Sequence, residues 1–499
     1  MGNHPTPSAT PDTNGAGFDP GLFSSLASLT LQDLGADSRE VNRTRAFVAY
    51  PGAVSDGRDF IPDAISRGAP AVLWECEGFA WRDEWRLPNL GVRHLKAHAS
   101  AIAGQIFGDP SARLWIVGVT GTNGKTSTSQ WIAQSLDHLG RRSAVIGTLG
   151  QGLVDQLTPA LNTTPDAIVL QRTLRDVLLA GAQACAMEVS SHGLDQGRVS
   201  GVKFDVALFT NLTRDHLDYH GTMETYAEAK ARLFRARGLK AAVLNVDDPF
   251  GRELEKRLRA TALQVISYGI GAGDLNARIE RLDTAGIAFA VKSQWGEARI
   301  ESSLLGRFNV SNLLGVLGVL LASGVSLADG ARIVQRLHSV EGRMQTLGGS
   351  GQPKVVIDYA HSPDALEKAL TTLRATVKAD LRLICVFGCG GDRDRGKRPV
   401  MGAIAARLAH HVIVTSDNPR TEPAHAIIDA IVAGAPSSDI EVIEDRREAI
   451  LAAVRRARAG DVVLVAGKGH ENYQEIQGVR HAFSDVAVAR NALINWKSA

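Results

Sequence analysis

The sequence predicts an α/β protein of three domains, built on parallel sheets. A chain of 499 residues corresponds to about three domains at roughly 150 residues each. Short apolar runs alternate with helix-length segments, which is typical of doubly wound parallel sheets. Turn signals and changes of pattern near residues 109 and 340 divide the chain into units.

The first 21 residues, MGNHPTPSATPDTNGAGFDPG, are rich in Pro, Gly, Ser and Thr. They contain neither the basic nor the apolar segment of a signal peptide, so we expect a disordered tail over residues 1–21. Runs such as AFVAYPG and PAVLWEC then alternate with helical patterns. This pattern predicts a small α/β module over residues 22–111.

A second domain is predicted over residues 112–338, where apolar strands again alternate with helices. A Gly-Asp-Pro turn signal precedes the strand WIVGV, and the later strands are SAVIGT, ACAMEV, VALFTN and KAAVLNV. The longest apolar stretch, NLLGVLGVLLASGV at residues 312–325, is shorter than the roughly 20 residues of a membrane-spanning helix. We therefore expect it to form a buried helix.

The third domain is predicted over residues 339–499, with another parallel sheet. Its predicted strands are KVVIDYA, RLICVFG, HVIVTSD, IEVIED and DVVLVAG. One strand is followed by GCGGDR, in which Arg393 occupies the place of the last glycine of a dinucleotide-binding fingerprint, and this weighs against a dehydrogenase. Sites in open parallel sheets lie at the carboxyl ends of strands, so the polar residues after each run are candidates.

Charge balance and cysteine content exclude several classes of protein. The 55 basic and 53 acidic residues nearly cancel, so we expect neither nucleic-acid binding nor attraction to an anionic membrane. The four cysteines form no C-x-x-C pair, and their small number is typical of a reducing compartment.

The segment GVTGTNGKTSTSQ, residues 118–130, predicts a phosphate-binding loop between a strand and a helix. It departs from the strict spacing G-x-x-x-x-G-K-[ST], because Val119 stands where the first glycine belongs. The physical requirements are still met. Backbone N–H groups at a helix start can bind an anion, Lys125 can reach the terminal phosphates, and the Thr126 hydroxyl can hold Mg²⁺. The alternative is a glycine-rich turn with a solvated lysine.

Three more candidates follow in the central domain. In the segment ACAMEVSSHGL, the apolar strand ends on Glu188, where its carboxylate can share a metal ion with Thr126. His216 comes after the next strand, and Lys230 lies in the helical segment TYAEAKARLF. The alternatives are a strand-end carboxylate without function, a structural histidine and a solvated surface lysine.

The third domain has candidates for binding an amino acid. Asp358 lies at a strand end, ahead of a helix that Ser362 is expected to cap. A guanidinium binds a carboxylate bidentately and a carboxylate binds an ammonium group, so two arginines and a glutamate can recognise both charged ends of an amino acid. These residues are Arg393, Arg420 and Glu471. The alternative is that they are loop charges facing water.

The combined motifs match one protein family. In chain order they are TGTNGKT, NTTPDA, MEVSSHGL, TRDHLDYHG, AKARLF, GRFNVSN, EGRMQ, DYAHSPDAL, CGGDRDRGKRP, SDNPR and GKGHENYQ. The chain resembles the Mur ligases over its whole length after the tail, including DSREVNRTRAFVAYPG in the first domain. This family builds its loop around G-T-x-G-K-[ST], so Gly121 and Gly124 are the glycines it expects.

The resemblance implies an N-terminal domain for the UDP end of the substrate, a central P-loop ATPase domain with a parallel sheet and a mobile C-terminal Rossmann-like domain. Ser38 and Arg39 are expected near the uridine diphosphate. The muramoyl-dipeptide is expected at Asn162, Thr163, Thr164, Ser190, Gln196 and Arg198. ATP is expected at Gly121, Thr122, Asn123, Gly124, Lys125, Thr126, Asn309, Arg343 and Asp358.

The resemblance also implies the catalytic residues, which are Lys125, Glu188, His216 and Lys230. The magnesium ligands would be Thr126, Glu188 and His216, together with Lys230 in its carbamylated form. The meso-diaminopimelate pocket would consist of Arg393, Asp417, Asn418, Pro419, Arg420, Gly467 and Glu471. The motif D-N-P-R marks members that add this amino acid, because Arg420 can bind its additional carboxylate.

The implied reaction is ATP-dependent amide formation in peptidoglycan precursor synthesis. ATP phosphorylates the D-glutamyl side-chain carboxylate of UDP-N-acetylmuramoyl-L-Ala-D-Glu, and the amine of meso-diaminopimelate displaces phosphate from the acyl phosphate. Closure of the C-terminal domain would bring the amine to the acyl phosphate. ATP and Mg²⁺ are the expected cofactors, and we expect a cytoplasmic monomer that is not an integral membrane protein.

Three alternatives to this activity remain. A lysine-adding Mur ligase differs in its amino acid. A folylpolyglutamate-type ligase shares the loop and the Rossmann-like units, but lacks D-N-P-R and the UDP-binding module. A nucleotide-dependent switch would hydrolyse ATP without an amino acid and has no reason to carry Arg420 and Glu471 together.

Overall fold

The computed structural model describes residues 20–52, 55–435 and 440–497. They form two compact units, one with the residues up to 125, 132–243 and 253–265, the other with 126–131, 244–252 and the residues from 266 onward. The predicted tail lies outside the described residues except at its last two positions, where helix α1 (Pro20–Ser28) already begins. Proline is well accepted in the first helical turn, so the helix can begin there. The boundaries of the three predicted domains stay predictions.

The N-terminal part of the first unit is a parallel sheet with an apolar core on each face. Its strands, in spatial order, are β1 (Asp33–Gly35), β2 (Arg45–Ala49), β3 (Val72–Glu75) and β4 (Asn89–Val92). Along β2, Val48 packs into one core and Phe47 into the other. Helices α3 (Leu95–Ile106) and α2 (Ile61–Ser66) contribute to these two cores, so both faces are covered, as parallel sheets require.

A second parallel sheet forms the rest of the first unit. Its neighbouring strands are β10 (Val206–Phe209), β5 (Trp115–Thr120), β9 (Ala184–Glu188) and β6 (Ser143–Gly147). The register pairs Thr120 with Phe209 and Val119 with Glu188, so the strands end at one edge. The sheet continues beyond β6 through the antiparallel strands β7 (Gly150–Leu153) and β8 (Gln156–Thr158).

Helices and one further strand complete this central region. They are α4 (Lys125–His138), α5 (Ala167–Leu179), α6 (Ser191–Asp195), α7 (Leu217–His220), α8 (Met223–Ala231), β11 (Ala241–Asn245) and α9 (Pro249–Leu258). Arg172 on α5 donates to the carboxylate of Asp33 on β1 at 3.0 Å, and Asp33 also accepts from Arg45 at 2.8 Å. The Arg172 pair joins the N-terminal sheet to the central region, while the Arg45 pair links β1 to β2 within that sheet.

The second unit contains antiparallel strands where the sequence predicts alternating strands and helices. β12 (Gln264–Ile270) is parallel to β13 (Leu275–Asp283), but β14 (Gly286–Ser293) and β15 (Gly296–Ser302) run antiparallel to their neighbours. The prediction of alternating strands and helices was wrong here. Only two residues separate β13 from β14 and β14 from β15. Such a connection forms a hairpin turn and is too short for a crossover helix.

The predicted buried helix is confirmed as α10 (Arg307–Ala322), in which all residues from Asn312 to Leu320 are buried. Helix α11 (Leu327–Val334) follows it. Across the described ranges, no helix has the length and apolar character needed to cross a membrane.

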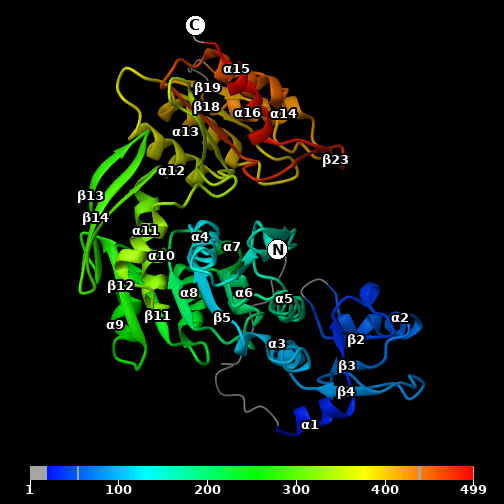
Figure 1. The fold of residues 1–499 in the computed structure, drawn as a ribbon. Coiled ribbons are helices and arrows are strands. Elements are labelled where there is room, and N and C mark those ends of the chain that lie inside the picture. The colour runs from blue at the N-terminus through cyan, green and yellow to red at the C-terminus, as the bar shows by residue number, and fades with distance from the viewer. Residues whose placement is uncertain (1–19, 53–54, 436–439, 498–499) are drawn as a thin grey trace. The chain divides into compact units, whose positions relative to one another are not determined.

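The C-terminal sheet confirms the predicted parallel arrangement. Its order is β16 (Gln345–Gly348), β17 (Lys354–Asp358), β21 (Val462–Ala466), β18 (Leu383–Phe387), β19 (His411–Val414) and β20 (Ile440–Val442), and β16 alone of these six pairs antiparallel. One core includes α12 (Pro363–Arg374), α13 (Lys397–Leu408) and α14 (Ala424–Val432); the other includes α15 (Arg446–Arg456) and α16 (Asp485–Ile494) (Figure 1). The hairpin β22 (Tyr473–Ile476) and β23 (Val479–Ala482) lies between β21 and α16 in sequence.

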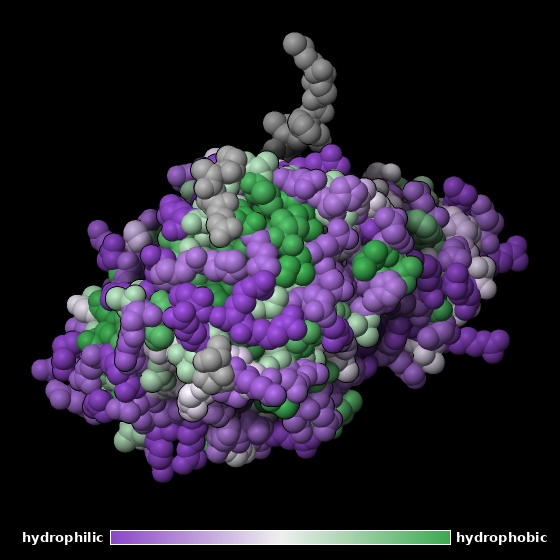
Figure 2. All heavy atoms as spheres, turned by 90° about the horizontal axis from the view of Figure 1, so that it is seen from above, coloured by the Kyte–Doolittle hydropathy of each residue, from purple (hydrophilic) through white to green (hydrophobic). Residues whose placement is uncertain are grey.

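The predicted cap of α12 is confirmed. Ser362 caps α12 by accepting a hydrogen bond from Ala365 N at 3.4 Å, and Pro363 is the first helical residue. On the face shown in Figure 2, hydrophilic residues are interspersed with smaller groups of hydrophobic ones.

Candidate active site

The predicted phosphate loop connects β5 to α4, and its conformation requires the two glycines. Gly121 has a φ of +146°, and a Cβ atom there would lie 2.0 Å from Thr210 Oγ1. Gly124 has a φ of +87°. Thr210 Oγ1 donates to Asn123 O at 2.6 Å, and Asn123 N donates to Asn211 Oδ1 at 3.0 Å. The residues after β10 thus fix the loop. The helix predicted after the loop is confirmed as α4, which begins at Lys125.

Two lysine ammonium groups meet at one carbonyl of this loop. Lys125 Nζ donates to Gly121 O at 2.9 Å and to Thr122 O at 2.8 Å. Lys230 Nζ donates to the same Gly121 O at 2.9 Å, and Lys230 is only 1% exposed. Burial, reinforced by the charge of Lys125, lowers the pKa of Lys230 well below its ordinary value. The alternative of a solvated surface lysine at position 230 is therefore wrong.

Glu188 is a buried carboxylate at the end of β9, only 1% exposed. Its Oε1 accepts from Thr148 N at 2.7 Å, and its Oε2 lies 3.3 Å from Thr148 Oγ1. A Cβ atom at Gly147, the last residue of β6, would lie 2.3 Å from Glu188 Oε1. Sequence reasoning missed Gly147, because the need for a small residue there appears only once β6 and β9 are neighbours.

His216 lies in a cluster of aromatic rings and is half exposed. It has a φ of +52° and precedes α7. Its ring is 4.9 Å from that of His192, which lies 4.1 Å from the ring of Tyr219. Sequence reasoning did not identify His192 or Tyr219. In the described part of the chain, no three His, Cys, Asp or Glu side chains are grouped as metal ligands, so the expected mixture of hydroxyl, carboxylate, imidazole and modified lysine remains a prediction.

Several predicted muramoyl-dipeptide residues lie together beside β9. Thr164 Oγ1 donates to Glu188 O at 2.9 Å and accepts from Ser190 N at 3.0 Å. Arg198 donates to Thr164 O at 2.7 Å and to Gln196 Oε1, also at 2.7 Å. The structure therefore joins Thr164, Ser190, Gln196 and Arg198 with Glu188.

The remaining predicted substrate residues are less closely connected. Thr163 Oγ1 lies 3.0 Å from Thr148 Oγ1, while Asn162 is exposed. Ser38 is buried in the N-terminal module, and Arg39 beside it is exposed and pairs with Asp37 at 2.6 Å. No hydrogen bond among the described residues connects Arg39 to the Thr164 group.

In the second unit, Asp358 lies at the end of β17. Its oxygens accept from Met344 N at 2.8 Å and from Ala360 N at 2.9 Å, while burial raises the pKa of the carboxyl group. The Arg343 guanidinium stacks 4.9 Å from the Tyr359 ring centre, and its Nη2 is 3.5 Å from Thr126 Oγ1. The third predicted nucleotide residue here, Asn309, is buried in α10 and donates to Leu305 O at 2.9 Å.

The D-N-P-R turn, residues 417–420, packs against the glycines that follow β18. A Cβ atom at Gly391 would lie 1.9 Å from Pro419 O, and one at Gly390 would lie 2.9 Å from Arg420 Nη1. Arg420 Nη1 donates to Gly391 O at 2.7 Å. The segment GCGGDR, which fails as a dinucleotide fingerprint, therefore provides the space for this turn. Sequence reasoning missed that role.

The structure brings most of the predicted amino-acid pocket together. Asn418 Nδ2 donates to Glu471 Oε2 at 2.8 Å. Asp417 lies against Gly467, where a Cβ atom would be 2.4 Å from Asp417 Oδ2. Asp417 and Asn418 are buried. The Arg420 and Glu471 side chains are 23% and 19% exposed, so neither is a loop charge that simply faces water. Arg393 is exposed and has no hydrogen bond to the other pocket residues within the described ranges.

A buried ion pair, Arg446 with Asp485, lies beneath this pocket. Both side chains are 0% exposed, and Arg446 Nη2 is 2.7 Å from Asp485 Oδ2. The guanidinium also donates to Ala466 O at 3.0 Å and approaches Ser416 O at 3.4 Å. Arg446 therefore connects the ends of β19 and β21, from which the pocket residues follow.

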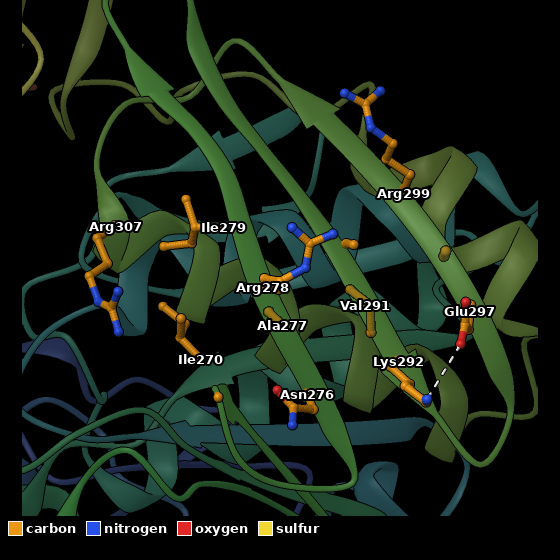
Figure 3. A pocket seen from close by; sticks show the side chains of 13 residues that line it. Ile270, Asn276, Ala277, Arg278, Ile279, Val291, Lys292, Glu297, Arg299 and Arg307 are labelled. Carbon is orange, nitrogen blue, oxygen red and sulfur yellow. Dashed lines mark ion pairs between the residues drawn. The ribbon is translucent and has the colours of Figure 1, made fainter.

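A separate cavity of about 890 Å³ lies on strands β12–β15. Figure 3 shows Arg278, Arg299 and Arg307 among its lining side chains, and Lys292 pairs with Glu297 at 3.9 Å. It contains none of the predicted site residues, so the candidate site does not depend on it.

Comparisons with known proteins agree with this arrangement. Three family models match the chain: "Mur ligase family, catalytic domain" over residues 30–105, "Mur ligase middle domain" over 119–320 and "Mur ligase, glutamate ligase domain" over 342–469. The UDP-N-acetylmuramoyl-L-alanyl-D-glutamate–2,6-diaminopimelate ligase of Chromobacterium violaceum is 51% identical over 480 residues, covering 96% of this chain and 97% of the relative. The ligase of the same name from Pseudomonas aeruginosa is 51% identical over 470 residues, covering 94% and 96%.

A solved structure of a ligase with this name is similar as well. It has a TM-score of 0.70 and 40% sequence identity, and the match covers 93% of this chain and 95% of that one. The predicted α/β fold class is confirmed. The chain belongs to the Mur ligase family, and it is a ligase.

Proposed function

We propose that this ligase adds meso-diaminopimelate to the D-glutamyl side-chain carboxylate of UDP-N-acetylmuramoyl-L-Ala-D-Glu, using ATP. The observation that carries the proposal is a pocket with a guanidinium and a carboxylate held at fixed positions. Arg420 is held by Gly391 O, and Glu471 is held by Asn418. The full-length relatives named for the same amino acid support it.

The chemistry begins with a carboxylate that is too unreactive to be attacked by an amine. Transfer of the γ-phosphoryl group of ATP to this carboxylate forms an acyl phosphate and ADP. The amine then adds to the acyl carbon, and the tetrahedral intermediate expels phosphate to leave the amide; the nitrogen loses a proton in this step. Backbone N–H groups at the start of α4 and the Lys125 ammonium would bind the phosphates and stabilise the developing charge.

The donor set also fits a divalent cation. Thr126, Glu188, His216 and a carbamylated Lys230 would hold Mg²⁺, which would screen the phosphate charges when bound. Buried oxygen donors such as the Glu188 carboxylate suit this hard cation. Because its pKa is lowered, Lys230 has a larger neutral fraction, and a neutral amine can add to CO₂, releasing a proton and forming a carbamate. This change would replace one of the two cations at Gly121 O by an anion.

The proposal includes the remaining substrate contacts and the setting of the enzyme. Ser38 and Arg39 would lie near the uridine diphosphate, and the group around Thr164 would bind the peptide. Arg343, Asp358 and Asn309 would contact the nucleotide. We propose that the enzyme acts as a cytoplasmic monomer in peptidoglycan precursor synthesis.

Product analysis tests the proposed activity. Incubation with ATP, Mg²⁺ and the UDP-muramoyl-dipeptide is expected to give ADP and a nucleotide product heavier by one diaminopimelyl residue, measured by mass spectrometry. Replacing diaminopimelate by lysine is expected to give little product, because lysine lacks the carboxylate that Arg420 would bind. A lysine product formed equally fast would overturn the specificity, and ATP hydrolysis that needs no amino acid would overturn the ligase reaction.

Removing the Arg420 side chain tests the pocket. Arg420→Ala is expected to raise the KM for diaminopimelate about ten- to a hundredfold, because a hydrogen-bonded charge contributes about 1.5–3 kcal/mol. Steady-state kinetics should show the KM for ATP unchanged. Arg480→Ala is a matched control, since Arg480 is exposed on the neighbouring hairpin and stacks on Tyr473 at 4.4 Å. Equal increases in the KM for ATP and for the amino acid would count against the assignment.

A further inference from the structure

Lys468, on the loop after β21, is a fully buried cation whose hydrogen-bond and ion-pair partners belong to the proposed amino-acid pocket; its Nζ also lies 5.6 Å from the centre of the Tyr473 ring. It is 0% exposed. Its Nζ donates to Asn418 Oδ1 at 2.8 Å and to Glu471 Oε2 at 3.0 Å, and it lies 3.9 Å from Asp417 Oδ1. Burying an ammonium group costs several kcal/mol unless it is paired and hydrogen-bonded, and here pocket residues do the pairing.

The hydrogen bonds to Lys468 determine how the Asn418 amide is turned. Lys468 Nζ and Glu475 N, at 2.8 and 2.9 Å, face the same atom of the amide, and both groups only donate. That atom must therefore be the oxygen, so the amide nitrogen points to Glu471 Oε2. An apolar side chain at position 468 would remove one of the two donors that select this orientation.

The same ammonium fixes one end of the Glu471 carboxylate. Oε2 accepts from both Lys468 and Asn418. No residue in the described part of the chain donates a hydrogen bond to Oε1, and the side chain is 19% exposed. Glu471 is thus held by one oxygen and presents the other to a ligand.

The charges nearest to Lys468 favour a cationic ligand group. The two carboxylates of Asp417 and Glu471 face one buried ammonium, which leaves one negative charge in excess. An ammonium group of the substrate would balance that charge, whereas the Arg420 guanidinium would bind a carboxylate.

We propose that Lys468 is a positioning residue, which orients Glu471 through Asn418 and by direct contact so that the free Glu471 oxygen binds a substrate ammonium group. This inference rests on the proposed function, because it assumes that the pocket binds the amino acid. Lys468 itself does not touch the substrate.

A double-mutant cycle tests this inference on the full-length enzyme. Lys468→Met is expected to raise the KM for diaminopimelate about ten- to a hundredfold, with kcat and the KM for ATP changed by less than about threefold. Glu471→Gln should raise the same KM. If Lys468 acts through Glu471, the KM for diaminopimelate of the double variant should be no higher than that of the poorer single variant. The increases in KM caused by Lys468→Met and Arg420→Ala should instead multiply when the two substitutions are combined.

Two further variants separate positioning from a general loss of structure. Lys468→Gln keeps the site polar and retains a donor, so its increase in KM should be smaller than that of Lys468→Met, even if the latter lowers the yield of folded protein. Arg382→Met is a matched control, because Arg382 pairs with buried Asp461 at 2.8 Å beside the starts of β18 and β21, at the opposite end of the sheet. It should lower the melting temperature but leave the KM for diaminopimelate unchanged.

The outcomes distinguish failure of the inference from failure of the proposed function. Independent, multiplying effects of Lys468→Met and Glu471→Gln would overturn the positioning role while the function stands, as would an unchanged KM in Lys468→Met. If Arg420→Ala and Glu471→Gln both leave the KM for diaminopimelate unchanged, the pocket assignment in the proposed function fails first.

Discussion

Lys125→Ala is expected to lower the rate of ADP formation in the complete reaction by at least about a thousandfold, which corresponds to roughly 4 kcal/mol of transition-state stabilisation. The Lys125 ammonium lies at the loop, bound to Gly121 O and Thr122 O. An alanine would remove the cation that can move from these carbonyls to the transferring phosphoryl group. Initial rates of ADP release, with both the nucleotide peptide and diaminopimelate present, measure the effect.

A surface lysine in the same unit provides the control for this variant. The Lys240 side chain is 74% exposed and pairs with Asp205 at 2.6 Å, so Lys240→Ala should change the rate little, because exposed ion pairs contribute less than about 1 kcal/mol. Turnover by Lys125→Ala at the wild-type rate would remove the phosphate-loop assignment.

The second large effect concerns stability. Asp485→Ala is expected to destabilise the C-terminal sheet by about 3–5 kcal/mol, because it leaves the fully buried Arg446 guanidinium without its carboxylate. The melting temperature should fall, and hydrogen exchange should quicken at the amides of β19 and β21, whose terminal regions the guanidinium connects.

An exposed ion pair between α12 and α13 gives the comparison. Arg407 and Glu367 lie 2.5 Å apart with half-exposed side chains, so Glu367→Ala should cost less than about 1 kcal/mol. If Asp485→Ala lowered the stability equally little, water would have to reach the Arg446 guanidinium, and the buried pair would not stabilise the ends of β19 and β21.

The sequence predicts those helices, strands and caps that are determined by residues close together in the chain. The strand and helix on either side of the phosphate loop, the Ser362 cap and the buried helix α10 all follow from apolar patterns and capping chemistry. The family resemblance is confirmed by near-full-length relatives. The loop pattern of this family has its glycines at positions 121 and 124, so it does not require a glycine in place of Val119.

Other features depend on contacts between distant segments, which a local pattern does not encode. The need for glycine at position 147 comes from Glu188, 41 residues later in the chain, on a neighbouring strand. The burial of Lys230 was equally invisible, since its helix reads like a surface helix until the loop carbonyl of Gly121 is placed beside it. The antiparallel strands β13–β15 were missed because the predicted alternation of strands and helices was extended beyond KAAVLNV, the last strand that the sequence pattern identified in the second domain.

The guanidinium of Arg446 has a further consequence for how amino-acid preference could be changed. Its nitrogens are held in one rigid plane, and two of them reach the carbonyl groups of Ser416 and Ala466. A single planar ion therefore bridges the two peptide segments that carry Asn418 and Lys468. Selections for ligases that accept other diamino acids should accordingly include positions around Arg446 and Asp485 on α15 and α16, as well as the residues proposed to meet the substrate.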